Sequence, residues 1–288
     1  MKYLRLVLVA VPLCLAGSAA QAATVDCDRE CLRGFITQYL NALAAHQPGT
    51  LPLDSTARFT EDSVEMHLGD GLWKDVSRIR PYRQDVLDVQ QGVAAAQVVV
   101  EEAGSPALLV LRLKVANKKI REIETMVTRT QKEGGLFKVD ALQAADKNMA
   151  SLPEKPQLPS REDAIRIAQF YPAGLKVGSF AAVDAPFASD AYRIENGVIT
   201  AGPGCSRAGC ENIQTQKIME HPFITTRVVA VDEELGIVLL RMNFGQTNSY
   251  GAGNALIVWE QFKVFGGQIH AVEAFMKIMP ASMGSGWD

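Results

Sequence analysis

The sequence lacks the local signatures of most cofactor-binding and catalytic sites. It has no Gly-rich phosphate loop, no G-x-S-x-G nucleophile elbow and no H-E-x-x-H motif. Its few histidines are widely separated along the chain and do not form a metal-binding cluster: His46, His67, His221 and His270. We therefore expect no metal and no cofactor, and any catalysis has to rely on general acid–base chemistry.

Runs of one charge sign are also missing. The 29 Lys and Arg residues and the 32 Asp and Glu residues give a formal net charge of −3, and the two signs are interspersed. A nucleic-acid-binding surface would show a basic patch or stripe, so we do not expect nucleic acid as a partner. Hydrophobic residues make up 48% of the chain, which is ample for buried cores.

The apolar run at the N-terminus is too short for a membrane anchor. It covers residues 6–16, whereas a membrane-spanning helix needs roughly 20 apolar residues. Basic residues precede the run, and Ala20-Gln21-Ala22 follows it as a small-x-small cleavage site. This pattern predicts a signal peptide over residues 1–22 and a periplasmic or secreted protein without membrane contact after cleavage.

Two close cysteine pairs remain after signal cleavage, Cys27 with Cys31 and Cys205 with Cys210. An even number of cysteines in an exported chain predicts two disulfides, although the connectivity stays open. A bridge between Cys27 and Cys31 requires an irregular turn before the helix, because residues four apart in a regular helix lie beyond disulfide reach. A four-thiolate zinc site is the alternative, and both the spacing and the oxidising compartment argue against it.

The chain contains one internal repeat that involves polar and turn residues. An Arg-x4-Asp-x3-Gly pattern occurs twice, 144 residues apart, at Arg83, Asp88, Gly92 and at Arg227, Asp232, Gly236. Residues 59–64 match residues 193–198 at an offset of 134, and residues 120–124 match residues 269–273 at an offset of 149. Two similar modules with longer loops in the second explain these offsets.

The repeat divides the mature chain into two modules. We predict a first module over residues 23–150, a Pro-rich linker over 151–159 and a second module over 160–288. Each module begins with an amphipathic helix, at residues 29–45 and 160–181. β-rich runs follow: 93–101, 107–116 and 120–129, then 225–231, 236–244, 255–265 and 269–278, with hairpin turns at Asn117-Lys118 and Gly266-Gly267. A helix inside a strongly curved antiparallel sheet makes a cone with a pocket at its open end.

Several short motifs resemble one family: Ala57-Arg58-Phe59-Thr60-Glu61, Leu68-Gly69-Asp70-Gly71-Leu72-Trp73, Tyr82-Arg83, Val231-Asp232-Glu233-Glu234 and Ser285-Gly286-Trp287. With them the chain resembles two-module proteins of the SnoaL-like branch of the nuclear transport factor 2-like superfamily, over residues 31–287. The resemblance implies an α+β fold of two tandem cone-shaped modules, each with N-terminal helices packed in a strongly curved antiparallel β-sheet. The superfamily includes cyclases, isomerases, dehydratases, lyases and non-catalytic binders, so the resemblance implies a fold rather than one function.

The densest polar segment, residues 64–73, supplies the first candidate site residues. On an extended strand Glu65 and His67 share one face, and His67 could act as a base that Asp70 orients. Trp73 would then form a stacking wall. The alternative is a solvated strand face followed by a glycine-rich turn.

Tyr82 and Arg83 form the second candidate group, with Arg227 as the counterpart of Arg83. An arginine fork in a concave site can bind a carboxylate or stabilise an oxyanion, and a nearby tyrosine hydroxyl can act as an acid. The alternative is an ion pair of each arginine with the aspartate five positions later, Asp88 or Asp232. Its recurrence in both modules favours a structural role for the aspartates.

Glu124 and Glu273 occupy matching places near the end of the two modules. A carboxylate facing an apolar cone would have a raised pKa and could take a proton from carbon, whereas an exposed strand edge is the alternative. The candidate substrate-binding residues are therefore Trp73, Glu124, Arg227 and Glu273, and the candidate catalytic residues are His67, Asp70, Tyr82 and Arg83.

These features predict an exported, cofactor-independent enzyme that acts by general acid–base chemistry on a small apolar or aromatic molecule. The expected reaction is that of a lyase, with loss of formaldehyde or water, or that of an isomerase. The resemblance supports this, since relatives with the same cone include polyketide cyclases and lyases that remove formaldehyde from lignin-derived aromatic diols. The alternative is a non-catalytic protein that binds a hydrophobic small molecule. Open sheets of this fold commonly dimerise, so a homodimer is an expected option.

Overall fold

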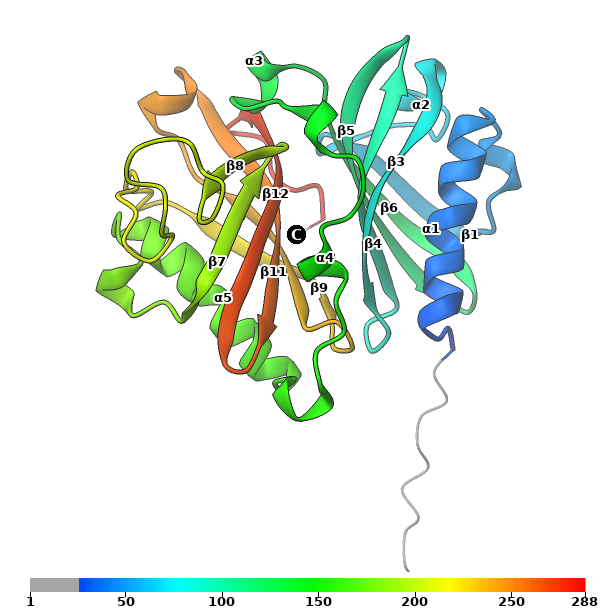
Figure 1. The fold of residues 1–288 in the computed structure, drawn as a ribbon. Coiled ribbons are helices and arrows are strands. Elements are labelled where there is room, and N and C mark those ends of the chain that lie inside the picture. The colour runs from blue at the N-terminus through cyan, green and yellow to red at the C-terminus, as the bar shows by residue number, and fades with distance from the viewer. Residues whose placement is uncertain (1–25, 288) are drawn as a thin grey trace, which may run out of the picture.

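The computed structural model describes residues 26–287, so the predicted signal peptide lies outside the described residues. The chain forms two six-stranded sheets with similar strand orders, and each sheet packs against a long N-terminal helix. Figure 1 shows the two sheets side by side, with the connecting segment running between them. Among the described residues no helix is long and apolar enough to cross a membrane.

The first half has the sheet order β2-β1-β6-β5-β4-β3. Its elements are α1 (Arg29–Ala44), η1 (Pro48–Thr50), β1 (Leu53–Glu61), β2 (Val64–Glu65), α2 (Leu72–Asp75), β3 (Val76–Asp88), β4 (Val93–Glu102), β5 (Ser105–Ala116) and β6 (Lys119–Thr128). The connecting segment contains only short turns of helix: α3 (Gln131–Gly134), η2 (Val139–Ala141), α4 (Lys147–Ala150) and η3 (Lys155–Gln157).

The second half repeats this layout, with the sheet order β8-β7-β12-β11-β10-β9. Its elements are α5 (Arg161–Lys176), η4 (Ala181–Val183), β7 (Phe187–Glu195), β8 (Val198–Ala201), β9 (Thr225–Asp232), β10 (Ile237–Asn243), η5 (Asn248–Tyr250), β11 (Asn254–Phe265) and β12 (Gln268–Pro280). The α+β fold of two similar cones is confirmed. The sheets are mixed rather than purely antiparallel, because the first long strand of each half pairs in parallel with the last one.

The strand register confirms all three offsets, but the arginines of the repeat do not match: Arg227 pairs with Arg241, whose equivalent Gln97 pairs with Gln84 rather than Arg83. Phe59 pairs with Ile123, and Arg193 pairs with Val272, which reproduces the offsets of 134 and 149. Asp88 pairs with Val93 and Asp232 with Ile237, at the offset of 144. Gly92 and Gly236 both have positive φ, 59° and 63°, and a side chain at either would collide with a backbone carbonyl of the last hairpin. The repeated glycines therefore meet the same steric requirement.

Three apolar cores hold the molecule together. One lies between α1 and the concave face of the first sheet, and the second lies between α5 and its own sheet. The third joins the other faces of the two sheets and includes Tyr82, Val110, Trp259 and Phe275. Because both faces of each sheet are covered, the two modules form one continuous packed unit.

Reciprocal ion pairs fasten the two halves. Arg161 at the start of α5 pairs with Asp88, and Arg29 at the start of α1 pairs with Asp232 at 2.6 Å. Each aspartate also accepts a backbone N–H from the other half, from Val231 in one case and from Leu87 in the other. Both aspartates are fully buried. They are structural, as expected, but they act between the modules.

The predicted pairs within each module are therefore wrong. Arg83 donates instead to Asp85, at 2.7 and 2.8 Å, and Arg227 donates to Glu124. The reason is that the two aspartates point across the module interface, where the opposite helix supplies the cation.

Both disulfides join the close cysteine pairs. Cys27 and Cys31 have their Cα atoms 5.3 Å apart, and Cys205 and Cys210 have theirs 6.0 Å apart. The expected irregular turn is present, because Asp28 is the N-cap of α1 and Cys27 precedes the helix. Two disulfides are typical of an oxidising compartment outside the cytoplasm.

Candidate functional site

The candidate residues of the first module do not form a single site. The strand β2 ends at Glu65, so His67 lies beyond it and is exposed to solvent. Asp70 pairs with Lys74 at 2.7 Å, and this hydrogen bond lowers the pKa of the aspartate. The pair of His67 and Asp70 therefore lies on the surface of the protein.

Trp73 belongs to the core rather than to a binding wall. Only 2% of its surface is exposed, and its indole N–H donates to the hydroxyl of Tyr39 at 3.2 Å. The two rings meet edge to face, with centroids 5.2 Å apart. Together with Leu72, Trp73 fills the interior of the first cone.

Tyr82 and Glu273 meet between the two sheets. The Tyr82 hydroxyl donates to Glu273 at 3.2 Å, and Tyr192 lies at the same distance from the other carboxylate oxygen. The Tyr192 hydroxyl also contacts Asp146 at 2.6 Å. Tyr192 has one proton for two carboxyl groups, so one of the two acids, Glu273 or Asp146, must hold a proton for both contacts to be hydrogen bonds. Burial, with the charge of Asp146, raises the pKa of Glu273 to about 7.

Glu124 and Arg227 also lie at the module interface. The guanidinium of Arg227 donates to both oxygens of Glu124, at 2.7 and 2.8 Å. Burial raises the pKa of Glu124, and the positive charge of Arg227 opposes this shift. Glu124, Arg227 and Glu273 therefore contact the opposite module, and neither glutamate faces a cone.

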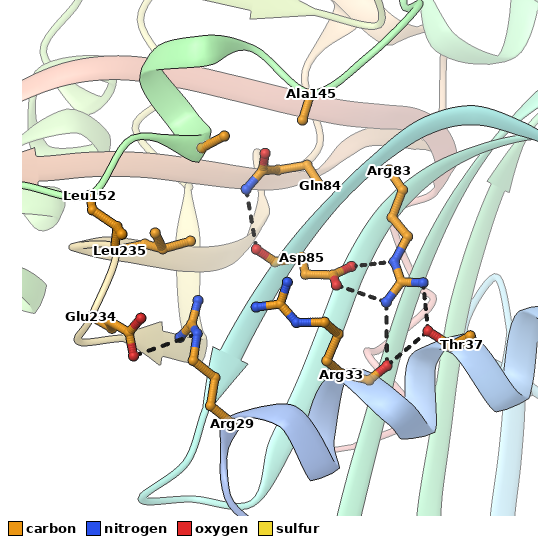
Figure 2. Close-up of a pocket in the computed structure, with 11 residues that line it drawn as sticks. Arg29, Arg33, Thr37, Arg83, Gln84, Asp85, Ala145, Leu152, Glu234 and Leu235 are labelled. Atoms are coloured by element: carbon orange, nitrogen blue, oxygen red, sulfur yellow. Dashed lines mark hydrogen bonds and ion pairs between the residues drawn. The ribbon is translucent and has the colours of Figure 1, made fainter.

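Arg83 lines a cleft of about 470 Å³ between α1, β3 and the connecting segment, which Figure 2 shows. Three arginines reach this cleft, but acids neutralise them. Arg83 pairs with Asp85, and Arg29 lies 3.7 Å from Glu234. The third, Arg33, lies 3.3 Å from an acid on its own helix. Each arginine of the cleft is thus paired with an acid, which makes the cleft a weaker candidate.

The second cone contains the stronger candidate pocket, with a volume of about 580 Å³. Its apolar wall consists of Leu175, Ile218, Phe244, Leu256 and Met276. Its polar lining includes Tyr171, Arg193, Glu195, Gln216, His221 and Tyr250. An apolar wall that faces several convergent polar groups, in a concavity of this size, is compatible with a small-molecule site.

Arg193 of β7 is the best-held polar side chain of this pocket. Its guanidinium donates to Thr200 at 2.8 Å, to Tyr171 at 3.1 Å and to Gln216 at 2.9 Å. Glu195 lies 3.5 Å away. The three acceptors lie on β8, on α5 and in the segment between β8 and β9. The arginine is therefore fixed in one orientation.

Glu260 of β11 lies behind this group and is fully buried. Burial raises its pKa to about 8, the charge of Glu195 adds to the increase, and Arg193 opposes it. Neither carboxyl oxygen has a hydrogen-bond partner of good geometry among the described residues. At neutral pH Glu260 is therefore an uncharged carboxylic acid.

His221 provides a neutral base on the pocket wall. Only 5% of its surface is exposed, and burial lowers its pKa. Its ring packs against Phe244 and Tyr250, with centroids 4.7 and 6.1 Å apart. The buried Nδ1 atom has no hydrogen-bond partner among the described residues. An uncharged imidazole can act as a general base when one of its nitrogens reaches a bound molecule.

The segment between β8 and β9 forms the lid of the pocket. It contains the Cys205–Cys210 disulfide, and residues 207–210 and 215–219 line the pocket. Gln216 donates to the carbonyl of Thr200, and Gly202 donates to that of Cys210. The first bond ties the lid to β8, and the second closes the turn that contains the disulfide.

The repeat itself contains a signal that points to this pocket. Arg193 pairs with Val272, and Phe59 pairs with Ile123, the residue of the first module that corresponds to Val272. An arginine of the second module therefore occupies the position of a core phenylalanine of the first. Likewise Glu260 occupies the position of Leu111. Charged residues at positions that are apolar in the other module mark the hollow cone. Single-residue patterns gave no hint of His221.

Within the described residues, no group of three or more His, Cys, Asp and Glu side chains could hold a metal ion. The pocket offers arginine, tyrosine, histidine and carboxyl groups instead. This donor set is suited to hydrogen bonding and proton transfer.

Comparison with known proteins identifies a related family for the second half of the chain. Residues 157–276 match a family described as a domain of unknown function (DUF8021). No curated protein matches the chain.

Two solved structures are similar to part of the chain. A de novo designed protein with a curved β-sheet is 20% identical, covering 35% of this chain and 88% of its own, with a TM-score of 0.30. An NTF-2 like protein of unknown function from Burkholderia xenovorans LB400 is 14% identical, covering 34% and 84%, with a TM-score of 0.25. These similarities are too distant to support a functional argument. The fold and pocket themselves define an α+β protein of two tandem cones, the first filled and the second hollow.

Proposed function

We propose that the second cone binds a small, largely apolar or aromatic molecule and converts it by cofactor-free acid–base chemistry, as a lyase or an isomerase. The observation that carries this proposal is the neutral imidazole of His221, which lines the pocket beside Phe244 and Tyr250 and whose Nδ1 atom has no partner among the described residues. In this proposal His221 removes a proton from the substrate, and Arg193 stabilises the negative charge that develops.

The hollow cone also supports a second candidate function, non-catalytic binding of a small molecule. The pocket has the apolar wall and the few fixed polar groups that binding alone requires. The two functions differ in their dependence on His221, because binding to the apolar wall does not need a base.

A variant of His221 tests the proposal. Purified protein would be incubated with lignin-type aromatic diols, ketosteroids and polyketide-like ketones in the presence of a chelator, with product masses followed over time. Thermal stabilisation by each compound would be measured in parallel. We expect His221→Gln to abolish turnover while stabilisation by the substrate remains. His270→Gln is the matched control, because His270 belongs to the same module, stacks on Phe265 and does not line the pocket.

The outcomes separate the candidate functions. Turnover that survives in His221→Gln would overturn the role of His221 as base. Stabilisation without turnover in the wild type would favour the binding protein. Neither effect with any compound would count against the second cone as a site for molecules of these classes.

A further inference from the structure

The charge of the second cone gives information about its ligand beyond size and polarity. Three cationic side chains line the pocket, Arg193, Arg207 and Lys217, whereas Glu195 is the single acidic residue of the lining. The buried Glu260 behind them does not restore the balance, because it is uncharged at neutral pH. The pocket therefore has an excess of positive charge beside its apolar wall.

Arg193 is fixed by neutral partners rather than by a matched acid. Thr200, Tyr171 and Gln216 each accept one of its hydrogen bonds, and these contacts use three of its five N–H groups. Glu195 lies 3.5 Å from Nε, and this atom already donates to Thr200. A guanidinium that is 6% exposed normally requires a closely paired acid.

The first module contains no such charge at the corresponding positions. Phe59 and Leu111 stand where the second module has Arg193 and Glu260, and Trp73 fills the space. A cation of this kind occurs only in the cone that is hollow. Its environment thus fits an anion that arrives from solution.

We infer that the ligand of the second cone is an organic monoanion, with a carboxylate or an equivalent oxyanion bound to Arg193 and an apolar body against Leu175, Phe244 and Leu256. This inference rests on the proposed function, which assigns the ligand site to this cone. When the ligand binds, its oxyanion replaces Glu195 beside the guanidinium of Arg193. It accepts hydrogen bonds from the N–H groups of this arginine that do not donate to Thr200, Tyr171 or Gln216.

The test compares a carboxylate with its neutral isostere. 4-Phenylbutyrate and 4-phenylbutyramide have the same size and the same apolar body, so calorimetric titration of both isolates the contribution of charge. We expect the carboxylate to bind the wild-type protein at least about tenfold more tightly than the amide. Arg193→Gln should remove this preference and leave the binding of the amide unchanged. Arg166→Gln is the control, because Arg166 lies on the exposed face of α5.

Glu195→Gln provides a second variant that does not remove a buried cation. It should increase the affinity for the carboxylate, because the competing acid is lost, and leave the affinity for the amide unchanged. Equal affinities for the two probes in the wild type, or weaker carboxylate binding in Glu195→Gln, would overturn the inference but leave the pocket as a binding site. If neither probe binds at millimolar concentration, the proposed function fails and the inference fails with it.

Discussion

Glu124 of β6 and Glu273 of β12 occupy equivalent positions in the two halves and have opposite surroundings. Both are buried at the interface between the sheets. Three arginines approach Glu124, at distances of 2.7, 3.7 and 3.9 Å: Arg227, Arg112 and Arg241. The equivalent register positions around Glu273 hold three glutamines: Gln84, Gln261 and Gln97. Cations thus surround one carboxyl group, whereas neutral amides occupy the equivalent positions around the other.

The surroundings of Glu273 predict that the stability of the folded protein depends on pH. The pKa of Glu273 is about 7 in the folded protein and near 4.3 in an unfolded chain. Between these values the folded state holds more protons, so its stability falls as the pH rises. The proton on Glu273 contributes about 2–4 kcal/mol to the free energy of unfolding. This contribution is complete below pH 4 and is lost above pH 7. Glu260, with a pKa of about 8, acts in the same direction.

Urea unfolding at pH 5 and pH 8 would measure this effect. We expect Glu273→Gln to be less sensitive to pH than the wild type and to be relatively more stable at pH 8, because the glutamine has no proton to lose. A variant that keeps the full pH dependence of the wild type would show that Glu273 is not the titrating group.

The arginines around Glu124 predict a large loss of stability at both pH values when this glutamate is replaced. Glu124→Gln removes the acid that approaches Arg227 at 2.7 Å and leaves a partly buried cation facing an amide. The loss of one partner from a buried ion pair costs about 3–5 kcal/mol. We expect this decrease at both pH 5 and pH 8, in the same urea experiment. A cost below about 1 kcal/mol would indicate that solvent or other acids compensate the cations.

The sequence predicts the regular parts of this fold well and its faces poorly. The helix predicted at residues 29–45 agrees with α1, whereas the one predicted at 160–181 extends beyond α5, which ends at Lys176. The later strands follow from β-rich runs. The register agrees with the offsets that the repeated polar residues define. However, β4 is buried on both faces along most of its length, so no alternation shows which side meets the helix. The faces of Glu124 and Glu273 could not be predicted for the same reason.

Other parts depend on contacts between distant segments. The strand β3 carries alternating arginines and a proline, a pattern that does not resemble a buried strand. The partner of Asp88 is 73 residues away in the chain, on the helix of the other module. Composition also gave no indication that Trp73 fills one cone while the other stays open. Comparison of the two modules position by position would have shown the charged replacements.

The reciprocal ion pairs predict that each buried aspartate holds the two halves together. Asp232→Asn would weaken the bond to Arg29 and place an amide opposite the N–H groups of Leu87 and Leu235. We expect a loss of about 3–5 kcal/mol in the free energy of unfolding, and a similar loss for Asp88→Asn. Glu233→Gln is the matched control, since Glu233 lies 3.8 Å from Arg161 and is half exposed, and its effect should stay below about 0.5 kcal/mol.

The two aspartates serve one interface, so their losses should not add. The double variant is expected to cost less than the sum of the single ones by at least about 0.5 kcal/mol. Strict additivity in urea unfolding would show that the two ends of the interface respond independently.

Trp73→Ala tests why only one cone is hollow. Removal of a fully packed tryptophan costs about 3–5 kcal/mol and leaves a cavity beside Tyr39, which also loses its indole partner. Because Phe59 and Leu111 lie in the same core, we expect this cavity to be apolar and to bind a neutral aromatic probe such as indole. Calorimetry should therefore show a new site for indole and no new site for 4-phenylbutyrate. A new carboxylate site in Trp73→Ala would contradict the idea that Arg193 gives the second cone its selectivity, because the first cone has no equivalent cation.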